Sequence, residues 1–364
     1  MEYLFEDVLE IKNGRNQKNV ENPEGQYPVY GSGGIMGYAD DYICDADTVI
    51  IGRKGNINNP IYVQERFWNV DTAFGLHANR ELLHPRYLCY FCTQYDFDRL
   101  NKTVTIPSLT KSDLLKIKID VPELCIQQHV VSTLTKIESI IKHRQSKLKC
   151  LDTLIKARFI ELFGDPEINP KKWNECALSE KLDVVGGYAF KSDQFDEVSG
   201  VPVLRIGNIN AGFFRPVNLV YWKEDDALER YAMYPGDLVM SLTGTVGKDD
   251  YGNVCILGND YDKYYLNQRN AKLEIKEGID KYYLSQLLKF EKIKKRLTGI
   301  SRGVRQANIS NKDILGLVVP LPPMELQNQF SDFVHQVDKS KVAVQKALDE
   351  TQTLFDSLMQ EYFG

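Results

Sequence analysis

The stretch PLPPMELQNQF, residues 320–330, places three prolines ahead of a long segment that contains none. Proline fixes φ and lacks a backbone N–H, so it is tolerated in the first turn of a helix but not in its interior. Pro322 and Pro323 therefore predict the start of a helix that runs to Gly364. The same boundary recurs 200 residues earlier as DVPELCIQQHV, residues 120–130, and predicts a second long helix.

This offset extends over the last part of each half of the chain without a gap. The matched pairs are Asp113 and Asp313, Leu115 and Leu315, Pro122 and Pro322, Gln127 and Gln327, Leu148 and Leu348, Leu154 and Leu354, Phe163 and Phe363, and Gly164 and Gly364. The upstream parts repeat more loosely, and short strands and Gly-rich turns in them predict an α+β fold. The predicted organisation is a tandem pseudo-repeat with a first domain at 1–121, a first helix at 122–164, a second domain at 165–321 and a second helix at 322–364.

Apolar residues in both predicted helices recur every three or four positions, which is the spacing of a heptad seam. The candidate packing residues are Leu134, Ile137, Ile141, Leu148, Leu151, Ile155, Val334, Val337, Val344, Leu348, Phe355 and Leu358. Arg144, Arg158, Lys341 and Thr351 are polar positions in the same register, and we interpret them as register devices. About 40 residues at ~1.5 Å each make a helix of roughly 60 Å, so the two seams would most simply bury each other. The alternative is that each helix lies on its own domain.

Composition bounds the class of protein without naming a partner. The hydrophobic fraction of 43% is typical of a globular chain with sizeable cores, and no apolar run approaches the ~20 residues of a membrane span. Seven scattered cysteines and an acidic N-terminal segment favour a reducing, cytoplasmic location. The formal net charge of −5 does not indicate a nucleic-acid-binding protein, so any such function must depend on local charge.

Two patterns resemble catalytic or metal motifs but are incomplete. Residues 59–62, NPIY, lack the second proline of the NPPY signature of adenine methyltransferases, and no glycine motif for S-adenosylmethionine accompanies them. Cys89 and Cys92 form a single CxxC, whereas a zinc site needs two further ligands. We therefore predict no catalytic residue, no metal site and no cofactor bound by this chain.

The duplicated motifs resemble the specificity subunit of type I restriction–modification systems. The resemblance is carried, in order, by YPVYGSGGIMGY (27–38), TVIIGRKGNI (48–57), NVDTAF (69–74), the two strand–proline–glutamine segments, and the helix ends ELFGDP (161–166) and EYFG (361–364). It implies two target-recognition domains that each read half of a split DNA site, and two helices packed as an antiparallel coiled coil that sets the spacing between the half-sites.

The same resemblance implies the partners of the chain. They are double-stranded DNA, two methyltransferase subunits docked on the helices, and restriction subunits held through the complex. S-adenosylmethionine, ATP and magnesium are expected on those partner subunits. The chain itself is expected to be non-catalytic.

Candidate DNA-contacting residues are those with cationic or amide side chains in Gly-rich loops. They are Arg15, Arg53, Lys54, Asn56 and Asn58 in the first domain, and Arg205, Asn208, Lys248, Gln268, Arg269, Asn270, Arg302 and Arg305 in the second. The last two end the segment KFEKIKKRLTGISRGVR, residues 289–305, which is the strongest local basic signal. Two plain alternatives stay open. The basic segment could be a solvated helix face, and Asn56 and Asn58 could be turn residues that bond their own backbone.

Two other classes of function stay open from the sequence. The first is a non-catalytic coiled-coil scaffold whose two heads bind protein or carbohydrate ligands. The second is a small-molecule enzyme, which the incomplete motifs disfavour. Steep salt dependence of DNA binding would separate the DNA reader from both, because each phosphate contact releases counterions.

Overall fold

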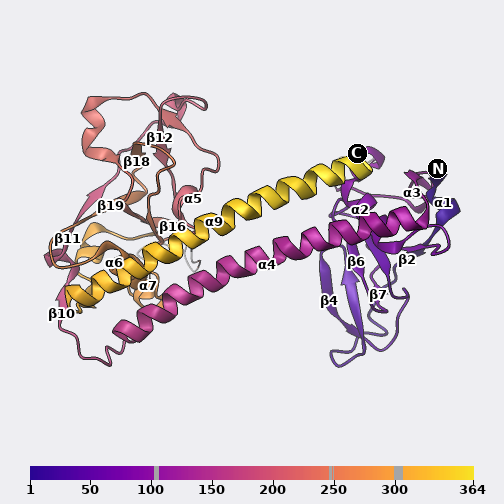
Figure 1. Cartoon of the computed structure of the whole chain (residues 1–364), viewed down its shortest axis with the longest axis horizontal. Coiled ribbons are helices and arrows are strands. Elements are labelled where there is room, and N and C mark those ends of the chain that lie inside the picture. Colours follow the sequence, from indigo (N-terminus) through magenta and orange to yellow (C-terminus); the bar gives the residue numbers. More distant parts are fainter. Residues whose placement is uncertain (102–105, 246–247, 249, 299–305) are drawn as a thin grey trace. The chain divides into compact units, whose positions relative to one another are not determined.

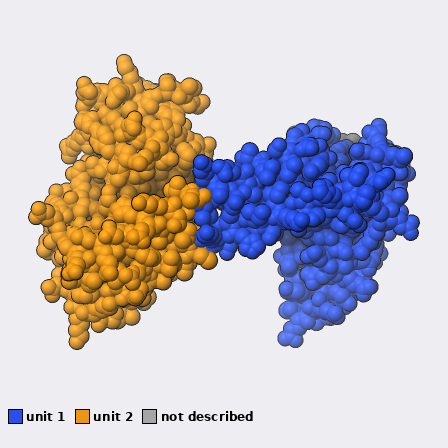
Figure 2. Space-filling model, in the orientation of Figure 1, with its two compact units in different colours: residues 1–147, 344–364 blue, residues 148–343 orange. Residues whose placement is uncertain are grey.

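A computed structural model describes residues 1–101, 106–245, 248, 250–298 and 306–364. It contains two compact units, residues 1–147 with 344–364 (unit 1) and residues 148–343 (unit 2) (Figure 2). In this division neither long helix forms a separate part of the chain, and the predicted domain boundaries stay predictions. Helix α4, Leu124–Phe163, begins in unit 1 and ends in unit 2, and α9, Met324–Phe363, begins in unit 2 and ends in unit 1.

Unit 1 contains the first domain, which is α+β as predicted. Its strands are β1 Glu2–Leu4, β2 Leu9–Asn13, β3 Tyr27–Gly31, β4 Gly34–Ala39, β5 Thr48–Gly52, β6 Ile61–Val63, β7 Trp68–Asn69, β8 Ala73–Ala78 and β9 Lys118–Asp120. Its helices are α1 Phe5–Val8, α2 Pro85–Gln94, the 3-10 turn η1 Phe97–Leu100 and α3 Lys111–Leu114, followed by α4.

Unit 2 contains the second domain. Its strands are β10 Glu175–Ala177, β11 Leu182–Gly186, β12 Val201–Leu204, β13 Tyr221–Trp222, β14 Ala232–Met233, β15 Leu238–Ser241, β16 Thr243–Thr245, β17 Val254–Ile256, β18 Tyr264–Leu266, β19 Asn270–Ile275, β20 Gln306–Asn308 and β21 Val318–Pro320. Its helices are α5 Ile206–Ile209, α6 Lys281–Leu288, α7 Glu291–Thr298 and α8 Asn311–Leu315, with 3-10 turns η2 Leu178–Glu180, η3 Ser192–Gln194 and η4 Asp226–Tyr231, followed by α9.

The two domains share one arrangement of strands, which we call their common frame. The first domain has an antiparallel sheet in the order β2-β8-β5-β6, and the second has its counterpart in the order β11-β19-β15-β17. A second sheet, β4-β3-β7, corresponds to β13-β12-β18-β14, and the pair β1-β9 corresponds to β10-β21. The loose upstream repeat in the sequence is therefore a repeat of strand order.

The apolar runs of the sequence form the central strands. Every residue of β5, Thr48–Gly52, is buried, and so is every residue of β15, Leu238–Ser241. A strand that is buried on both faces needs a continuous run of apolar residues. A strand with one solvent-exposed face instead alternates apolar and polar residues. This explains why TVIIG and LVMS carry no polar alternation.

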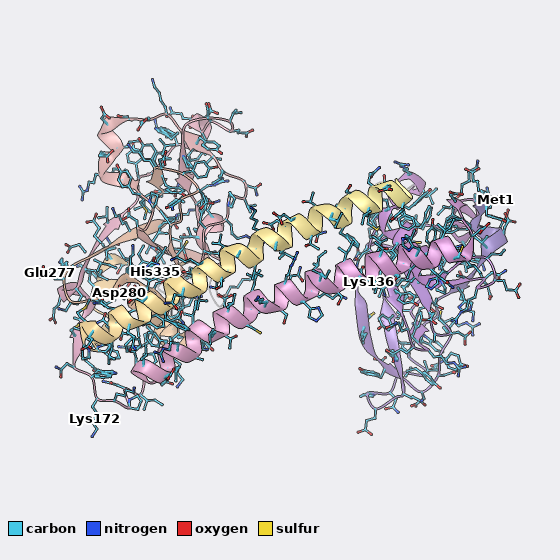
Figure 3. The ribbon with its side chains drawn as sticks, viewed as in Figure 1. Met1, Lys136, Lys172, Glu277, Asp280 and His335 are labelled. Carbon is cyan, nitrogen blue, oxygen red and sulfur yellow. The ribbon has the colours of Figure 1, made fainter. Side chains whose placement is uncertain are left out.

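Side chains cap the shorter helices of both domains. The ring Nδ1 of His84 accepts a hydrogen bond from the Arg86 backbone N–H at 3.1 Å at the start of α2, with Pro85 as the first helical residue. At the equivalent start of α6, the Asp280 carboxylate accepts from two backbone N–H groups. Figure 3 places Asp280 beside the first part of α9. These caps satisfy N–H groups that have no partner within the helix.

Each unit combines the beginning of one long helix with the end of the other. In unit 1, Val130 and Leu134 of α4 belong to the same buried cluster as Met359 of α9. In unit 2, the ring of Phe159 near the end of α4 lies 5.4 Å from that of Phe330 near the start of α9. Within each unit, residues of both long helices therefore contribute to the same buried cluster.

The termini of the helices agree closely with the prediction from proline. Helix α4 begins two residues after Pro122 and α9 two residues after Pro322. Gly164 follows α4 with a φ of 81°, a left-handed conformation that glycine adopts without steric cost. None of the helices among the described residues is both long enough and apolar enough to cross a bilayer.

Candidate nucleic-acid interface

In the first domain the structure brings two of the predicted cations to one turn. Arg15 follows β2 and Arg53 follows β5, and both are exposed. The Arg15 backbone N–H donates to Asn69 O at 3.0 Å, and the Arg53 backbone N–H donates to Thr72 O at 2.7 Å. The two arginines therefore flank the turn at residues 70–72. Lys54, the next residue after Arg53, is exposed as well.

The two predicted asparagines of this domain make contacts within it. Asn58 donates from Nδ2 to Asp98 at 2.7 Å and accepts from the Phe97 backbone N–H at 2.8 Å, so both ends of its amide hold η1. Asn56 donates to Ser32 O at 3.4 Å. These partners are distant in sequence, so the bonds differ from the alternative in which each asparagine bonds its own local backbone. Contact of either side chain with DNA stays a prediction.

In the second domain four predicted residues line one cavity. Arg205, Asn208, Gln268 and Arg269 surround a cavity of about 590 Å³, together with Asn267 and the ring of Phe190. Arg205 is half-buried, and Gln268 and Arg269 are exposed. Lys248 is exposed but does not line this cavity.

Two of the predicted contacts need correction, because their side chains lie inside the second domain. Asn208 is 1% exposed; its Oδ1 accepts from the Arg205 backbone N–H, and its Nδ2 donates to Arg215 O and Val217 O. Asn270 is 0% exposed and donates to Leu204 O at 2.7 Å. A buried amide bonded to backbone cannot reach a base edge without opening the domain, so both residues position the loops around them.

The described part of the basic segment forms ion pairs within the protein. Arg302 and Arg305 lie outside the described residues. Within the described part, Lys292 forms an ion pair with Glu167 at 2.7 Å, and Lys295 with Glu291 at 2.5 Å. These cations therefore act partly within the protein, in agreement with the solvated-face alternative.

The predicted packing residues of the helices are all at least half-buried. The buried ones are Leu134, Ile137, Ile141, Ile155, Val334 and Val337, and the half-buried ones are Leu148, Leu151, Val344, Leu348, Phe355 and Leu358. Two of the polar positions meet each other in unit 1, where the Arg144 guanidinium donates to the hydroxyl of Thr351 and to Ala347 O.

The heptad pattern missed the residues that anchor the helix ends. Phe159 and Phe163 of α4 are buried, as is Met359 of α9, although the pattern selected their neighbours Arg158, Leu162 and Leu358. The Phe159 ring stacks on Tyr283 of the second domain at 5.3 Å. The helix end therefore turns a different face inward, toward the domain. The sequence did contain a signal for these residues, because Phe159, Phe163 and Met359 form a second set of apolar positions, each one residue after a position in the heptad pattern.

The cysteine pair has the environment of core residues. Cys89 and Cys92 are buried, and burial raises the pKa of the Cys89 thiol to about 11. In the described part of the chain, no group of three or more His, Cys, Asp or Glu side chains could hold a metal ion. These thiols contribute packing volume to the first domain.

Comparison with known proteins identifies the family. The family described as "Type I restriction modification DNA specificity domain" matches residues 2–150 and again residues 170–351. The chain belongs to this family. The two matches correspond to the two repeats, so each contains one copy of the specificity domain.

Relatives in the specificity-domain family include proteins from an archaeon and a bacterium. The chain is 26% identical over 339 residues to the type I restriction enzyme MjaVIII specificity subunit of Methanocaldococcus jannaschii, covering 85% of this chain and 75% of the relative. It is 26% identical over 182 residues to the EcoBI specificity subunit of Escherichia coli, covering 48% of this chain and 35% of the relative.

Solved structures of the family share the fold. The S subunit of a type I restriction–modification system from M. genitalium matches with a TM-score of 0.65 at 17% identity, covering 100% of this chain and 96% of that one. A chain from a study of complex assembly and conformational transition of the type I R-M system matches with a TM-score of 0.55 at 16% identity, covering 100% and 97%. The specificity-domain fold therefore extends over the full sequence.

Proposed function

We propose that this chain is the DNA-specificity subunit of a type I restriction–modification complex, and that it reads an asymmetric, bipartite DNA site. The observation that carries the proposal is the double match to the specificity-domain family, with one copy per repeat. Two domains built on one frame but carrying different loop residues suit two different half-sites, since spacing in a protein sets spacing on the duplex. A scaffold for protein or carbohydrate ligands would have no reason to carry two DNA specificity domains.

The direct test uses the chain in complex with its methyltransferase subunits and a randomised DNA library. We expect one motif with two dissimilar parts and a constant gap. With ~6–10 phosphate contacts, affinity should fall roughly 10³- to 10⁵-fold between 50 and 200 mM salt. Binding without sequence preference would contradict the proposal.

We further infer that α4 and α9 pack as an antiparallel coiled coil. Within unit 2 the contacts run in opposite directions along the two helices: Asp152 pairs with Lys341 at 2.5 Å, and the Arg158 guanidinium lies 5.8 Å from the ring centroid of Phe333. In unit 1 the bonds from Arg144 to α9 follow the same direction. Such a pair of helices could act as a ruler between the half-sites.

Zero-length crosslinking with a carbodiimide tests this pairing. The reagent joins a carboxylate to an amine only at ion-pair distance, so it should couple Asp152 to Lys341. The pair Asp183 and Lys276, at 2.7 Å within the second domain, is the positive control. Coupling of the control pair alone would contradict the helix pairing.

We also propose the partners and the location of the complex. The chain recognises the DNA sequence for the complex and is not itself catalytic. Two methyltransferase subunits dock on the helices and use S-adenosylmethionine, and restriction subunits use ATP and magnesium. The duplicated helices support a pair of identical partners, because each repeat offers an equivalent surface. All seven cysteines are free thiols, which suits the reducing cytoplasm.

A further inference from the structure

A turn occupies the same position in the frame of both domains. In the first domain it comprises residues 70–72, between β7 and β8, and in the second residues 267–269, between β18 and β19. Three backbone hydrogen bonds surround each turn in the same way. They are Gly14 N to Ala73 O, Arg15 N to Asn69 O and Arg53 N to Thr72 O in the first domain, and Gly187 N to Asn270 O, Tyr188 N to Leu266 O and Leu242 N to Arg269 O in the second. The two turns are therefore structurally equivalent.

In the second domain this turn lies beside the end of β12. Strands β12 and β18 are neighbours in the second domain (Figure 1). They pair in parallel, with Val203 opposite Tyr265 and Leu204 opposite Leu266. The carboxyl ends of parallel neighbours lie at one edge of the sheet. Arg205 therefore comes next to the turn at 267–269, although more than 60 residues separate them in sequence. The cavity of about 590 Å³ opens at this edge.

The cavity lining combines apolar residues with Arg, Asn, Gln and Ser side chains and contains no carboxylate. Among the described residues, neither Arg205 nor Arg269 forms an ion pair, and no Asp or Glu lines the cavity. Other cations of the same domain do pair with carboxylates, such as Lys272 with Asp237 at 3.0 Å and Lys263 with Glu229 at 2.9 Å. In a chain with a net charge of −5, two unneutralised guanidiniums on one cavity indicate a ligand rich in acceptors.

The first domain carries different residues at the equivalent positions. Gly31, the last residue of β3, is equivalent to Arg205, which follows β12. The turn of the first domain holds Asp71 and Thr72 where the second domain has Gln268 and Arg269. The cations of the first domain come from the flanking segments instead. Its Arg15 and Arg53 stand where the second domain has Tyr188 and Leu242. One frame thus presents two distinct patterns of donors.

We propose that this turn is the base-reading edge of each domain, and that Arg205, Gln268 and Arg269 determine the half-site read by the second domain. The proposal rests on the function proposed above and assigns it to residues. Arginine donates in a bidentate manner to guanine O6 and N7, and glutamine to the Hoogsteen edge of adenine. Lysine, which suits phosphate as a point charge, is absent from the cavity lining. The half-site of the second domain therefore includes a guanine contacted by Arg205 or Arg269.

The experiment compares variants of the subunit–methyltransferase complex on a randomised library. Arg205→Ala and Arg269→Ala should each relax the preference at one position of the second half-site by roughly 10- to 100-fold and leave the first half-site unchanged. Arg53→Leu should do the reverse. Arg230→Ala is the matched control, because Arg230 is an exposed arginine of the same domain outside the cavity lining.

The outcomes separate this inference from the proposed function. A wild-type complex without sequence preference would overturn the proposed function and this inference with it. A wild-type bipartite motif that survives unchanged in Arg205→Ala and Arg269→Ala would overturn the inference alone. Equal weakening on all sequences would make these arginines phosphate contacts and would also overturn it.

Discussion

Gln127 and Gln327 share two hydrogen bonds in the two repeats. Both side chains are fully buried. Gln127 Oε1 accepts from the His84 backbone N–H at 2.8 Å, and Gln327 Oε1 accepts from the Asp280 backbone N–H at 2.8 Å. Each Nε2 donates at 2.7 Å to the carbonyl of the proline that precedes its helix. Each glutamine therefore ties the start of a long helix to the cap of a domain helix.

Gln127→Met should loosen the junction between α2 and α4, since a buried donor or acceptor left without a partner costs about 1–3 kcal/mol. We expect the free energy of local opening in unit 1 to fall by about 2–4 kcal/mol. Hydrogen exchange of the α2 amides measures it. Gln128→Met is the matched control, because Gln128 is exposed. Equal exchange in both variants would show that the glutamine bonds do not stabilise the junction.

Phe159→Ala should open the end of α4 in unit 2. The Phe159 ring is fully buried and contacts four aromatic rings, those of Phe163, Tyr283, Phe290 and Phe330. Removal of such a side chain typically costs about 3–5 kcal/mol. Ile160→Ala, one position later and 38% exposed, should cost much less. Urea unfolding monitored in unit 2 provides the comparison, and equal losses would argue that the end of α4 is not anchored through Phe159.

His84 should make the stability of unit 1 depend on pH. Burial lowers the pKa of His84 from its usual value of 6.5. The neutral ring caps α2 by accepting an N–H, and protonation of the ring removes that acceptor. As pH falls, His84 is therefore protonated at a higher pH in the unfolded chain than in the folded one. The free energy of unfolding should fall as pH drops below about 6.5, by at most about 1.4 kcal/mol per pH unit.

His84→Asn provides the control for this prediction, because asparagine is a good N-cap and does not titrate. Unfolding of both proteins should be followed between pH 7.5 and 5.0. We expect the slope with pH to be smaller in the variant. An unchanged slope would assign the pH dependence to other groups.

Asn208→Ala should behave differently from Arg205→Ala. Loss of the Asn208 amide leaves the carbonyls of Arg215 and Val217 without this donor, so we expect the second domain to lose about 2–3 kcal/mol of stability. Arg205→Ala should change DNA preference with little change in melting temperature, since its side chain is half-exposed. Thermal unfolding alongside DNA selection separates the two roles. A normal melting temperature for Asn208→Ala would contradict its positioning role.

The sequence alone determined the repeat, the α+β class of both domains and the long helices. Proline at 122 and 322 marks a helix start through its own covalent geometry, and the long helices begin within two residues of it. Heptad spacing likewise reports which side of a helix is apolar. These are local properties, so no knowledge of the rest of the fold is required.

Only the tertiary structure decided which residues share a site and which face of each helix end is buried. Arg205 and Asn208 are three residues apart and both line the cavity, yet Arg205 is half-buried and Asn208 is almost fully buried, because the Asn208 amide bonds to the backbone of Arg205, Arg215 and Val217. Phe159 is buried beside the half-buried Arg158 because the end of α4 packs on Tyr283 as well as on Phe330 of α9. Burial depends on contacts between segments that are distant in the chain, and such contacts leave no mark in the local spacing of residues.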